Sequence, residues 1–221
     1  ASAIEVVPNA VDPRRFTPRG RRDATRRRLV PFGRFAIGFH GRPRPWHGLE
    51  LLARAAALLI ERGAPVHLVL VGRGDFAPML AERQLAARVT SIEWVPHDEV
   101  GRYVASFDVL PLTYPPDLPC YFSPLKLKEA MACAVTPVVP ALGDLTRVVR
   151  HGENGLVYPA GGVEGLAAAI ERLIRDDAER ERLGRAARAS ALEVTWEDIA
   201  ARVLEHAVDR GSSGDRRGVA R

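Results

Sequence analysis

The amino-acid sequence predicts an α/β fold, a Rossmann-like doubly wound parallel sheet flanked by helices. Short apolar runs alternate along the chain with segments of helical periodicity. The run 66–71 is almost continuously apolar, which is typical of a strand buried on both faces of a parallel sheet. This alternation implies right-handed crossovers, and ligands bind such sheets beyond the carboxyl ends of the strands.

The predicted strands are residues 35–39, 66–71, 90–95, 107–112 and 136–139, most of them short apolar runs. The predicted helices have apolar residues at helical spacing or a start signal, and they cover residues 48–62, 77–86, 97–105, 124–133, 163–175 and 178–192. A last helix is predicted to start at Thr195-Trp-Glu-Asp198, where Thr195 and Asp198 have the spacing of a capping box. Residues 1–18 start on a short strand followed by a turn, and residues 210–221 are predicted to be a disordered tail.

Composition limits the class of protein. With 221 residues, 47% of them apolar, the chain is long enough for one large or two small domains. No apolar run approaches the roughly 18 residues that cross a bilayer, and the first ten residues do not resemble a signal peptide. Cys120 and Cys133 give no disulfide framework and no metal-ligand spacing, which favours a reducing cytoplasm.

The net charge of +5 is concentrated in two arginine clusters, at residues 19–28 and 210–221. Such clusters can form a solvated helix face or contact anionic lipid, so a location peripheral to the membrane stays open. Nucleic acid is not expected as a partner, because no aromatic side chains are interleaved with the arginines.

The most informative segment is the helix predicted to begin after strand 107–112. Ser123 is the expected N-cap and Pro124 the first helical residue, so a helix N-terminus lies at the mouth of a strand–helix–strand unit. The free N–H groups and positive dipole end of such a terminus suit a phosphate. Lys126 lies in the first turn, and Glu129 lies one turn further on, where a carboxylate can accept hydrogen bonds from sugar hydroxyls.

Five segments, in order and spacing, resemble the carboxy-terminal, sugar-donor-binding domain of GT-B glycosyltransferases of the retaining family 4, also called group 1. They are residues 7–18, 41–48, 69–74, 107–133 and 152–159. The second reads Gly-Arg-Pro-Arg-Pro-Trp-His-Gly and is similar to the family's Gly-Arg-x4-Lys-Gly loop. The resemblance spans about residues 4–209, and it makes residues 1–18 an interdomain segment and residues 19–209 the sugar-nucleotide-binding domain.

The resemblance implies two catalytic positions in the loop after the first strand. There an arginine and a lysine neutralise the departing diphosphate, and Arg42 matches the arginine. His47 stands where lysine is usual, and a neutral histidine donates one hydrogen bond but no charge. Arg44 is expected to compensate, and Gly41 to border the bound substrate.

The resemblance also assigns substrate contacts on the later helix. Glu129 matches the glutamate that holds the nucleotide ribose, whereas Tyr121 replaces the one that touches the transferred sugar. Backbone N–H groups after Ser123, at Leu125 and Lys126, are expected to hold the diphosphate. After this helix the family's single glycine is replaced by Ala134-Val135, so that turn must be built differently.

The implied function is glycosyl transfer with retention, with Val95 and Pro96 bordering the base. The expected sugar donor is a nucleotide sugar such as a UDP- or GDP-sugar, and no cofactor or metal is expected. An N-terminal acceptor-binding domain is the expected partner, and without it the chain is expected to be inactive. The setting that the resemblance suggests is polysaccharide synthesis for the cell envelope.

Two alternatives stay open. Residues 72–77 match the dinucleotide fingerprint Gly-x-Gly-x-x-Ala after a strand, but Glu93 lies inside its strand rather than at the end, where the acidic residue belongs. The chain can also be a non-enzymatic domain that binds a sugar nucleotide. Each candidate also has an ordinary structural interpretation: Arg42 and Lys126 as surface cations, and His40 as a satisfied loop histidine.

Overall fold

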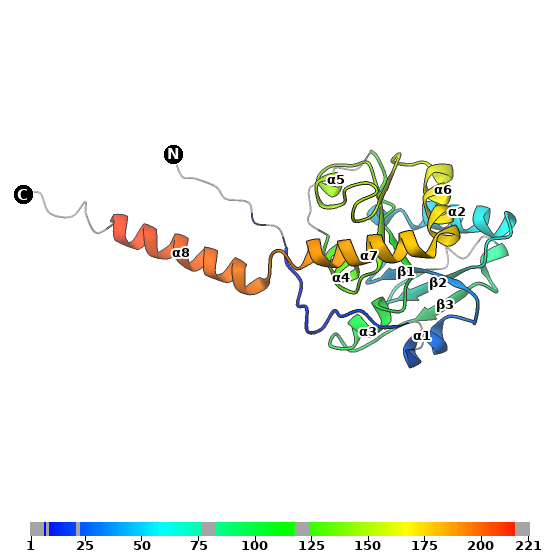
Figure 1. Cartoon of the computed structure of the whole chain (residues 1–221), viewed down its shortest axis with the longest axis horizontal. Coiled ribbons are helices and arrows are strands. Elements are labelled where there is room, and N and C mark those ends of the chain that lie inside the picture. The colour runs from blue at the N-terminus through cyan, green and yellow to red at the C-terminus, as the bar shows by residue number, and fades with distance from the viewer. Residues whose placement is uncertain (1–6, 8, 21–22, 77–82, 118–123, 215–221) are drawn as a thin grey trace, which may run out of the picture.

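The computed structural model describes residues 7, 9–20, 23–76, 83–117 and 124–214. Within these ranges the chain forms one six-stranded sheet with the order β3-β2-β1-β4-β5-β6, in which every neighbouring pair is parallel (Figure 1). The strands are β1 (Phe35–His40), β2 (Val66–Val71), β3 (Val89–Ile92), β4 (Val109–Pro111), β5 (Thr136–Pro140) and β6 (Leu156–Tyr158). The order reverses between β1 and β4, as in doubly wound folds, so the predicted fold class is confirmed.

The α-helices are α1 (Ala24–Leu29), α2 (Leu49–Glu61), α3 (Val100–Val104), α4 (Leu125–Ala132), α5 (Leu145–Val148), α6 (Val163–Arg175), α7 (Asp177–Ala191) and α8 (Trp196–Gly214). Two single-turn 3₁₀ helices, η1 (Pro45–His47) and η3 (Arg83–Leu85), lie in the connections. The helix predicted over residues 163–175 has the bounds of α6, and the helix predicted over residues 178–192 corresponds to α7.

Both faces of the sheet are buried, which explains the apolar runs of its strands. Alternate residues of a strand point to opposite faces, and in β2 Leu68 and Leu70 join one core cluster whereas Val69 and Val71 join the other. Residues of α2 and α6 belong to the first cluster, and residues of α3 and α4 belong to the second. This two-sided burial fixes the register of the strands and therefore the position of every loop at their carboxyl ends.

Some predicted boundaries are wrong. Strand 90–95 ends at Ile92 and helix 97–105 begins only at Val100, because the chain turns at Pro96, whose carbonyl accepts a hydrogen bond from the Glu99 N–H. Strand 107–112 is shortened to β4. The helix expected over residues 77–86 is represented by η3 alone, since residues 77–82 lie outside the described ranges.

The last helix begins as the sequence predicts. The Thr195 N–H donates to Asp198 Oδ2 at 2.7 Å and the Asp198 N–H donates to Thr195 Oγ1 at 3.2 Å, which confirms the capping box. In Figure 1 α8 projects away from the body of the domain. It continues to Gly214, so the segment expected to be disordered from residue 210 begins inside a helix. The strand expected near the amino terminus falls on residues 1–6 and 8, outside the described ranges.

After α4 the turn is indeed built without the family's glycine. Ala134 adopts a left-handed φ of 56°, and it is the only non-glycine residue with a positive φ in the described part of the chain. Its N–H donates to the carbonyl of Met131. Gly184 of α7 packs against this turn so tightly that a Cβ there would lie 2.2 Å from the Ala134 carbonyl oxygen.

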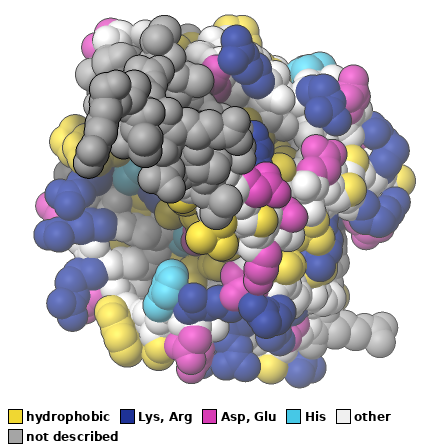
Figure 2. Space-filling view, turned by 90° about the vertical axis from the view of Figure 1, so that its left-hand side faces the viewer, with side chains coloured by type: hydrophobic (Ala, Val, Ile, Leu, Met, Phe, Trp, Pro, Cys, Tyr) yellow, Lys and Arg dark blue, Asp and Glu magenta, His cyan; other side chains and the backbone are white. Residues whose placement is uncertain are grey.

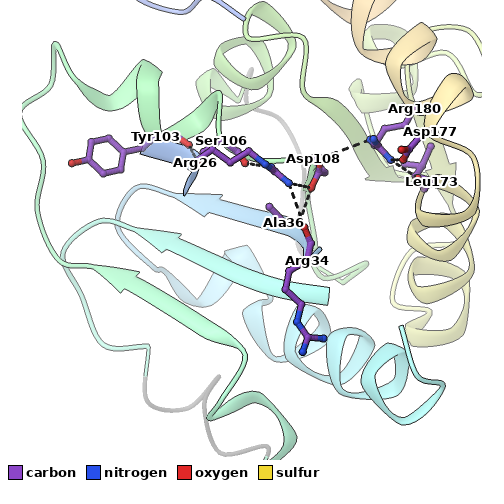
Figure 3. A network of polar contacts seen from close by, with 9 residues as sticks. All are labelled: Arg26, Arg34, Ala36, Tyr103, Ser106, Asp108, Leu173, Asp177 and Arg180. Carbon is purple, nitrogen blue, oxygen red and sulfur yellow. Dashed lines mark hydrogen bonds and ion pairs between the residues drawn. The ribbon is translucent and has the colours of Figure 1, made fainter. Parts of the chain in front are cut away.

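Behind the amino ends of the strands, Asp108 anchors a buried polar network (Figure 3). Its carboxylate accepts hydrogen bonds from Arg26 Nη2 and from the Ala36 N–H, each at 2.7 Å, and Arg180 Nε lies 3.9 Å away. Arg26 also donates to the carbonyl of Ser106. The network joins α1, β1 and α7, and it gives two cationic side chains a counter-charge inside the protein.

Candidate functional site

A cavity of about 300 Å³ lies at the topological switch point, beyond the carboxyl ends of β1, β2 and β3 and beside the start of α4. Its walls consist of His40, Gly41, Val71, Gly72, Arg73, Glu93, Trp94, Val95, His97, Val100, Leu125, Lys126 and Glu129. We call this hollow the site cavity. Ligands of doubly wound domains bind at this place, because the loops of adjacent strands separate there.

Two glycines shape the floor of the site cavity. Gly41 follows β1 with a φ of 99° and Gly72 follows β2 with a φ of 142°, conformations that side chains rarely permit. A Cβ on Gly72 would lie 2.5 Å from the carbonyl oxygen of Gly41, and one on Gly41 would lie 3.0 Å from Cε of Lys126. The glycines therefore let the ends of β1 and β2 approach each other beneath the Lys126 side chain.

Glu129 is held by a histidine that the sequence did not pair with it. Its Oε2 lies 2.7 Å from Nε2 of His40, the last residue of β1, whose side chain is almost fully buried. Burial acts to raise the pKa of Glu129, but the hydrogen bond from His40 and the charges of His40, His97 and Lys126 bring the pKa below its ordinary value. Glu129 is therefore an oriented carboxylate that stays ionised at neutral pH.

The tautomer of His40 follows from this contact. A carboxylate only accepts hydrogen bonds, so Nε2 of His40 carries the ring proton and donates a hydrogen bond to Glu129. Nδ1 of His40 is buried and has no hydrogen-bond partner among the described residues. His40 therefore orients the carboxylate of Glu129. With the ring proton on Nε2, its Nδ1 carries no proton that could be donated into the cavity.

Lys126 lies in the first turn of α4, three residues before Glu129. Its Nζ lies 2.6 Å from Nε2 of His47 and 4.5 Å from the centre of the Phe39 ring. Burial lowers the pKa of Lys126 to about 7, an effect that the negative charge of Glu129 partly offsets. Burial, with the charges of Lys126 and Arg44, lowers the pKa of His47 to about 4, so His47 is neutral at physiological pH.

The structure separates the predicted site residues into groups. Gly41, Val95, Leu125, Lys126 and Glu129 line the site cavity together. Tyr121 and Ser123 lie outside the described residues, so their predicted roles stay predictions.

The helix start differs from the prediction by one position. Pro124 is the N-cap of α4 and its carbonyl accepts from the N–H of Leu127, so Pro124 is not the first helical residue. The N–H groups of Leu125 and Lys126 still lie in the first turn, where an α-helix offers N–H groups without intrahelical acceptors.

The remaining predicted residues lie beside the cavity rather than in its wall. Arg42 and Arg44 are exposed in the loop 41–48, and Arg44 lies over the Trp46 ring at 5.8 Å. Among the described residues Arg42 has no hydrogen-bond or ion-pair partner, so its guanidinium can reach toward a ligand. His47 contacts the cavity through Lys126, and Pro96 directs the turn after β3.

Several cavity residues were missed by sequence reasoning. Arg73 lies between two glycines after β2, in a turn that carries the family resemblance and matches the dinucleotide fingerprint, but the arginine itself was given no role in the site. Glu93 and Trp94 were assigned to the interior of a strand, and β3 instead ends at Ile92 and leaves both in the cavity wall. Trp94 is 65% exposed, an unusual state for tryptophan, and offers a flat apolar surface to a ligand.

A larger hollow, of about 730 Å³, lies at the opposite end of the strands from the site cavity, where β1 begins. It is lined by the arginine-rich α1 and by Phe32, Phe35 and Ile174, among others. Two of its four charged residues, Arg26 and Asp177, already take part in the buried network around Asp108. Size alone therefore does not identify the site, and the chemistry of the side chains favours the site cavity.

The described residues contain neither a cluster of metal ligands nor a membrane-spanning helix. No group of three or more His, Cys, Asp or Glu side chains among them is placed to hold a metal ion. No helix in the described ranges has the length and apolar character required to cross a membrane.

The strand order, with a cavity lined by charged side chains at its switch point, places this chain in the class of Rossmann-like α/β domains. Within that class the chain belongs to the family described as glycosyl transferases group 1, whose family model matches residues 34–176. The match includes β1 to β6, the loop 41–48 and α4, so every described residue of the site cavity lies inside it.

Individual relatives agree with this assignment. The chain is 32% identical over 218 residues to a D-inositol 3-phosphate glycosyltransferase of Pseudarthrobacter chlorophenolicus, covering 94% of this chain and 51% of that protein. Among solved structures, it is similar to sucrose-phosphate synthase of Thermosynechococcus elongatus (TM-score 0.82, 24% identity, 96% of this chain and 54% of the other). It is also similar to HepE of Anabaena in complex with UDP and glucose (TM-score 0.77, 22% identity, 91% and 56%). The chain thus spans about half the length of the curated relatives it matches.

Proposed function

We propose that this chain is the sugar-donor-binding domain of a glycosyltransferase, which transfers a sugar from a nucleotide sugar to an acceptor with retention of anomeric configuration. The observation that carries the proposal is the site cavity, which places the Lys126 amine and the first turn of α4 beside the oriented carboxylate of Glu129. Membership of the glycosyl transferases group 1 family and the likeness to a structure that holds UDP and glucose support it.

In this proposal each part of the nucleotide has its own partners. The N–H groups of Leu125 and Lys126, the Lys126 side chain and Arg42 bind the diphosphate. Glu129, oriented by His40, accepts hydrogen bonds from the ribose hydroxyls. The base lies against Val95 and Trp94, which offer apolar surface at the cavity wall. The base is uracil or guanine, in line with a UDP- or GDP-sugar.

The chemistry that this arrangement supplies is charge stabilisation. When the bond between the anomeric carbon and the diphosphate breaks, negative charge develops on the departing diphosphate oxygens. Cations and backbone N–H groups that already contact those oxygens in the bound state lower the barrier, because they need no further rearrangement as the charge appears. In this proposal Arg42 and Lys126 take that role, His47 acts through Lys126, and no resident cofactor takes part.

Arg42→Ala is expected to weaken binding of a nucleoside diphosphate by about 1.5–3 kcal/mol, the contribution of a hydrogen bond to a charged group. Isothermal titration of the parent and the variant with UDP, GDP and ADP measures this loss and identifies the base. Arg147→Ala is a matched control, since Arg147 is an exposed arginine on α5 that does not line the cavity. An unchanged affinity in Arg42→Ala would remove Arg42 from the site, and no binding of any nucleotide by the parent would contradict the proposed function.

We further propose that the acceptor is bound by a second domain, the expected N-terminal partner, because the relatives have about twice the length of this chain. Residues 1–221 alone are then expected to bind the nucleotide sugar but not to transfer its sugar. To test this, the chain is incubated with UDP-glucose or GDP-mannose and a bacterial glycolipid extract, and the nucleoside diphosphate that is released is measured. Multiple turnovers above the rate of spontaneous hydrolysis would overturn it, and so would acceptor-dependent release.

Contact with a membrane surface stays a prediction from the arginine clusters. Within the first cluster Arg19 pairs with Asp23, Arg26 with Asp108, and Arg28 with the Tyr103 hydroxyl. On the face shown in Figure 2 basic and acidic side chains are interspersed rather than gathered in one patch. Sedimentation with anionic vesicles would measure any such contact. A role in polysaccharide synthesis for the cell envelope is a separate prediction, from the family resemblance.

A further inference from the structure

We propose that binding of the sugar-donor diphosphate is coupled to the uptake of one proton by Lys126, and that His47 is the positioning residue that holds the neutral lysine amine when the site is empty. The inference rests on the proposed function, because it takes the diphosphate as the ligand. It assigns to His47 a role that differs from that of the lysine usual at its place in the loop.

The hydrogen bonds of His47 determine the protonation of its neighbour. A neutral imidazole has one nitrogen that donates and one that accepts. Nδ1 of His47 accepts from the backbone N–H of Arg44 at 3.1 Å, and a backbone N–H can only donate. The ring proton is therefore on Nε2.

Nε2 lies 2.6 Å from Nζ of Lys126, a hydrogen-bond distance. An ammonium group has three N–H donors and no lone pair, so it cannot accept the Nε2 proton. The two contacts of His47 are satisfied together only if Lys126 is a neutral amine whose lone pair accepts from Nε2. A protonated His47 together with a charged Lys126 is not an alternative, because an imidazolium carries a proton on both nitrogens. Its Nδ1–H would then face the backbone N–H of Arg44, which also can only donate.

The surroundings of Lys126 allow a neutral amine at physiological pH. The Phe39 ring of β1 lies against Nζ, and Gly41 packs on the side-chain carbons. The charged groups that face the pair are Glu129 on the same helix and Arg44 from the loop, while His97 faces Glu129 from the turn after β3. Because burial lowers the pKa of Lys126 to about 7, the neutral form is already abundant at pH 7 and predominates at pH 8.

A bound diphosphate reverses this balance. Its negative charges beside Nζ favour the ammonium form, so the lone pair of Nζ takes a proton from the solvent and the lysine carries one positive charge. The ammonium can no longer accept from His47, and its N–H groups turn to the phosphate oxygens. His47 Nε2–H is then free to donate to the same ligand, so both side chains bind it after a single protonation.

The sign of the pH dependence follows from linkage. The bound state raises the pKa of Lys126 above its value in the empty site, so binding takes up a proton at every pH between the two values. Affinity is high below pH 7 and falls as the pH rises above it. A single group that must be protonated for binding, with a pKa of about 7 in the empty site, gives a roughly 25-fold loss of affinity between pH 6.5 and 8.5.

Isothermal titration with UDP-glucose and GDP-mannose at pH 8.0, in HEPES and in Tris buffers, measures the protons taken up, because these two buffers differ in ionisation enthalpy and contain no phosphate to compete for the site. These ligands are suitable because both phosphates of a nucleotide sugar are fully ionised throughout pH 6–9. For the nucleotide sugar that binds, we expect about one proton per ligand at pH 8.0 and close to none at pH 5.5. An observed enthalpy that is independent of the buffer at pH 8.0, with intact binding, would overturn the coupling and leave the proposed function standing. Failure of both nucleotide sugars to bind would overturn both proposals.

Three variants locate the proton. Lys126→Arg keeps a permanent charge and is expected to bind with no proton uptake and with little change of affinity between pH 6.5 and 8.5. His47→Leu removes the Nε2 donor and is expected to reduce uptake at pH 8.0, because the amine loses the hydrogen bond that favours its neutral form. Lys128→Arg, on the same helix but outside the cavity wall, is expected to take up protons as the parent does. Uptake that persists in Lys126→Arg would place the proton elsewhere and contradict the proposal.

Discussion

Replacing Asp108 by asparagine should lower the free energy of unfolding by about 3–5 kcal/mol. Asp108 has a side chain that is only 6% exposed, between Arg26 and Arg180, whose side chains are 9% and 5% exposed. The neutral amide keeps the size of the carboxylate but removes its charge. The buried guanidinium of Arg26 then loses the carboxylate it pairs with, and that of Arg180 keeps, among the described carboxylates, only Asp177, whose side chain is 66% exposed. This loss exceeds what any exposed ion pair of the chain can contribute.

Urea denaturation followed by circular dichroism measures the change. The matched control is Asp144→Asn, because Asp144 pairs with Arg147 at 3.4 Å but is 74% exposed, and it should cost less than about 1 kcal/mol. A cost below 1 kcal/mol for Asp108→Asn would mean that the network is not a source of stability. The network also bears on the site, since the Ala36 N–H that bonds to Asp108 belongs to β1, the strand that ends at His40.

Much of the fold could be predicted because it follows from local pattern. In α6 the residues Leu166, Ile170 and Leu173 recur at helical spacing and are all buried, so periodicity alone located the helix. The three-residue β6 has too few positions for any period, and only its pairing with β5 defines it. Likewise, β3 ends earlier than predicted because its pairing with β2 stops at Ile92, although Trp94 and Val95 have high strand propensity.

Single residues of the candidate site could be predicted from the element that carries them, but the contacts between residues of different elements could not. Lys126 and Glu129 followed from the start of one helix, and both line the site cavity. Their partners could not be predicted, because His40 is 89 residues from Glu129 in sequence and His47 is 79 residues from Lys126. Such contacts depend on the register of β1 against β4 and on the loop that Gly41 and Gly48 allow, and neither can be obtained from a local pattern.

Glu129→Gln should weaken nucleoside diphosphate binding by about 3 kcal/mol, or roughly a hundredfold in Kd, from two hydrogen bonds to a charged group at about 1.5 kcal/mol each. The carboxylate can accept from both ribose hydroxyls, whereas the glutamine must present an N–H₂ to one of them or to His40 Nε2–H. Unlike the effect of Arg42→Ala, this loss depends on the ribose. Inorganic pyrophosphate, which has no ribose, should bind the variant as it binds the parent.

Titrations of the parent, Glu129→Gln and Arg42→Ala with nucleoside diphosphate and with pyrophosphate separate the two contacts. Glu99→Gln serves as the matched control, since Glu99 pairs with Arg102 at the surface and does not line the site cavity. Thermal unfolding of Glu129→Gln shows whether the fold is kept when His40 Nε2 no longer donates to a carboxylate. Equal weakening of both ligands in Glu129→Gln would mean that Glu129 acts on the diphosphate, by way of the neighbouring Lys126, and not on the ribose. Unchanged affinity for both would exclude it from the site.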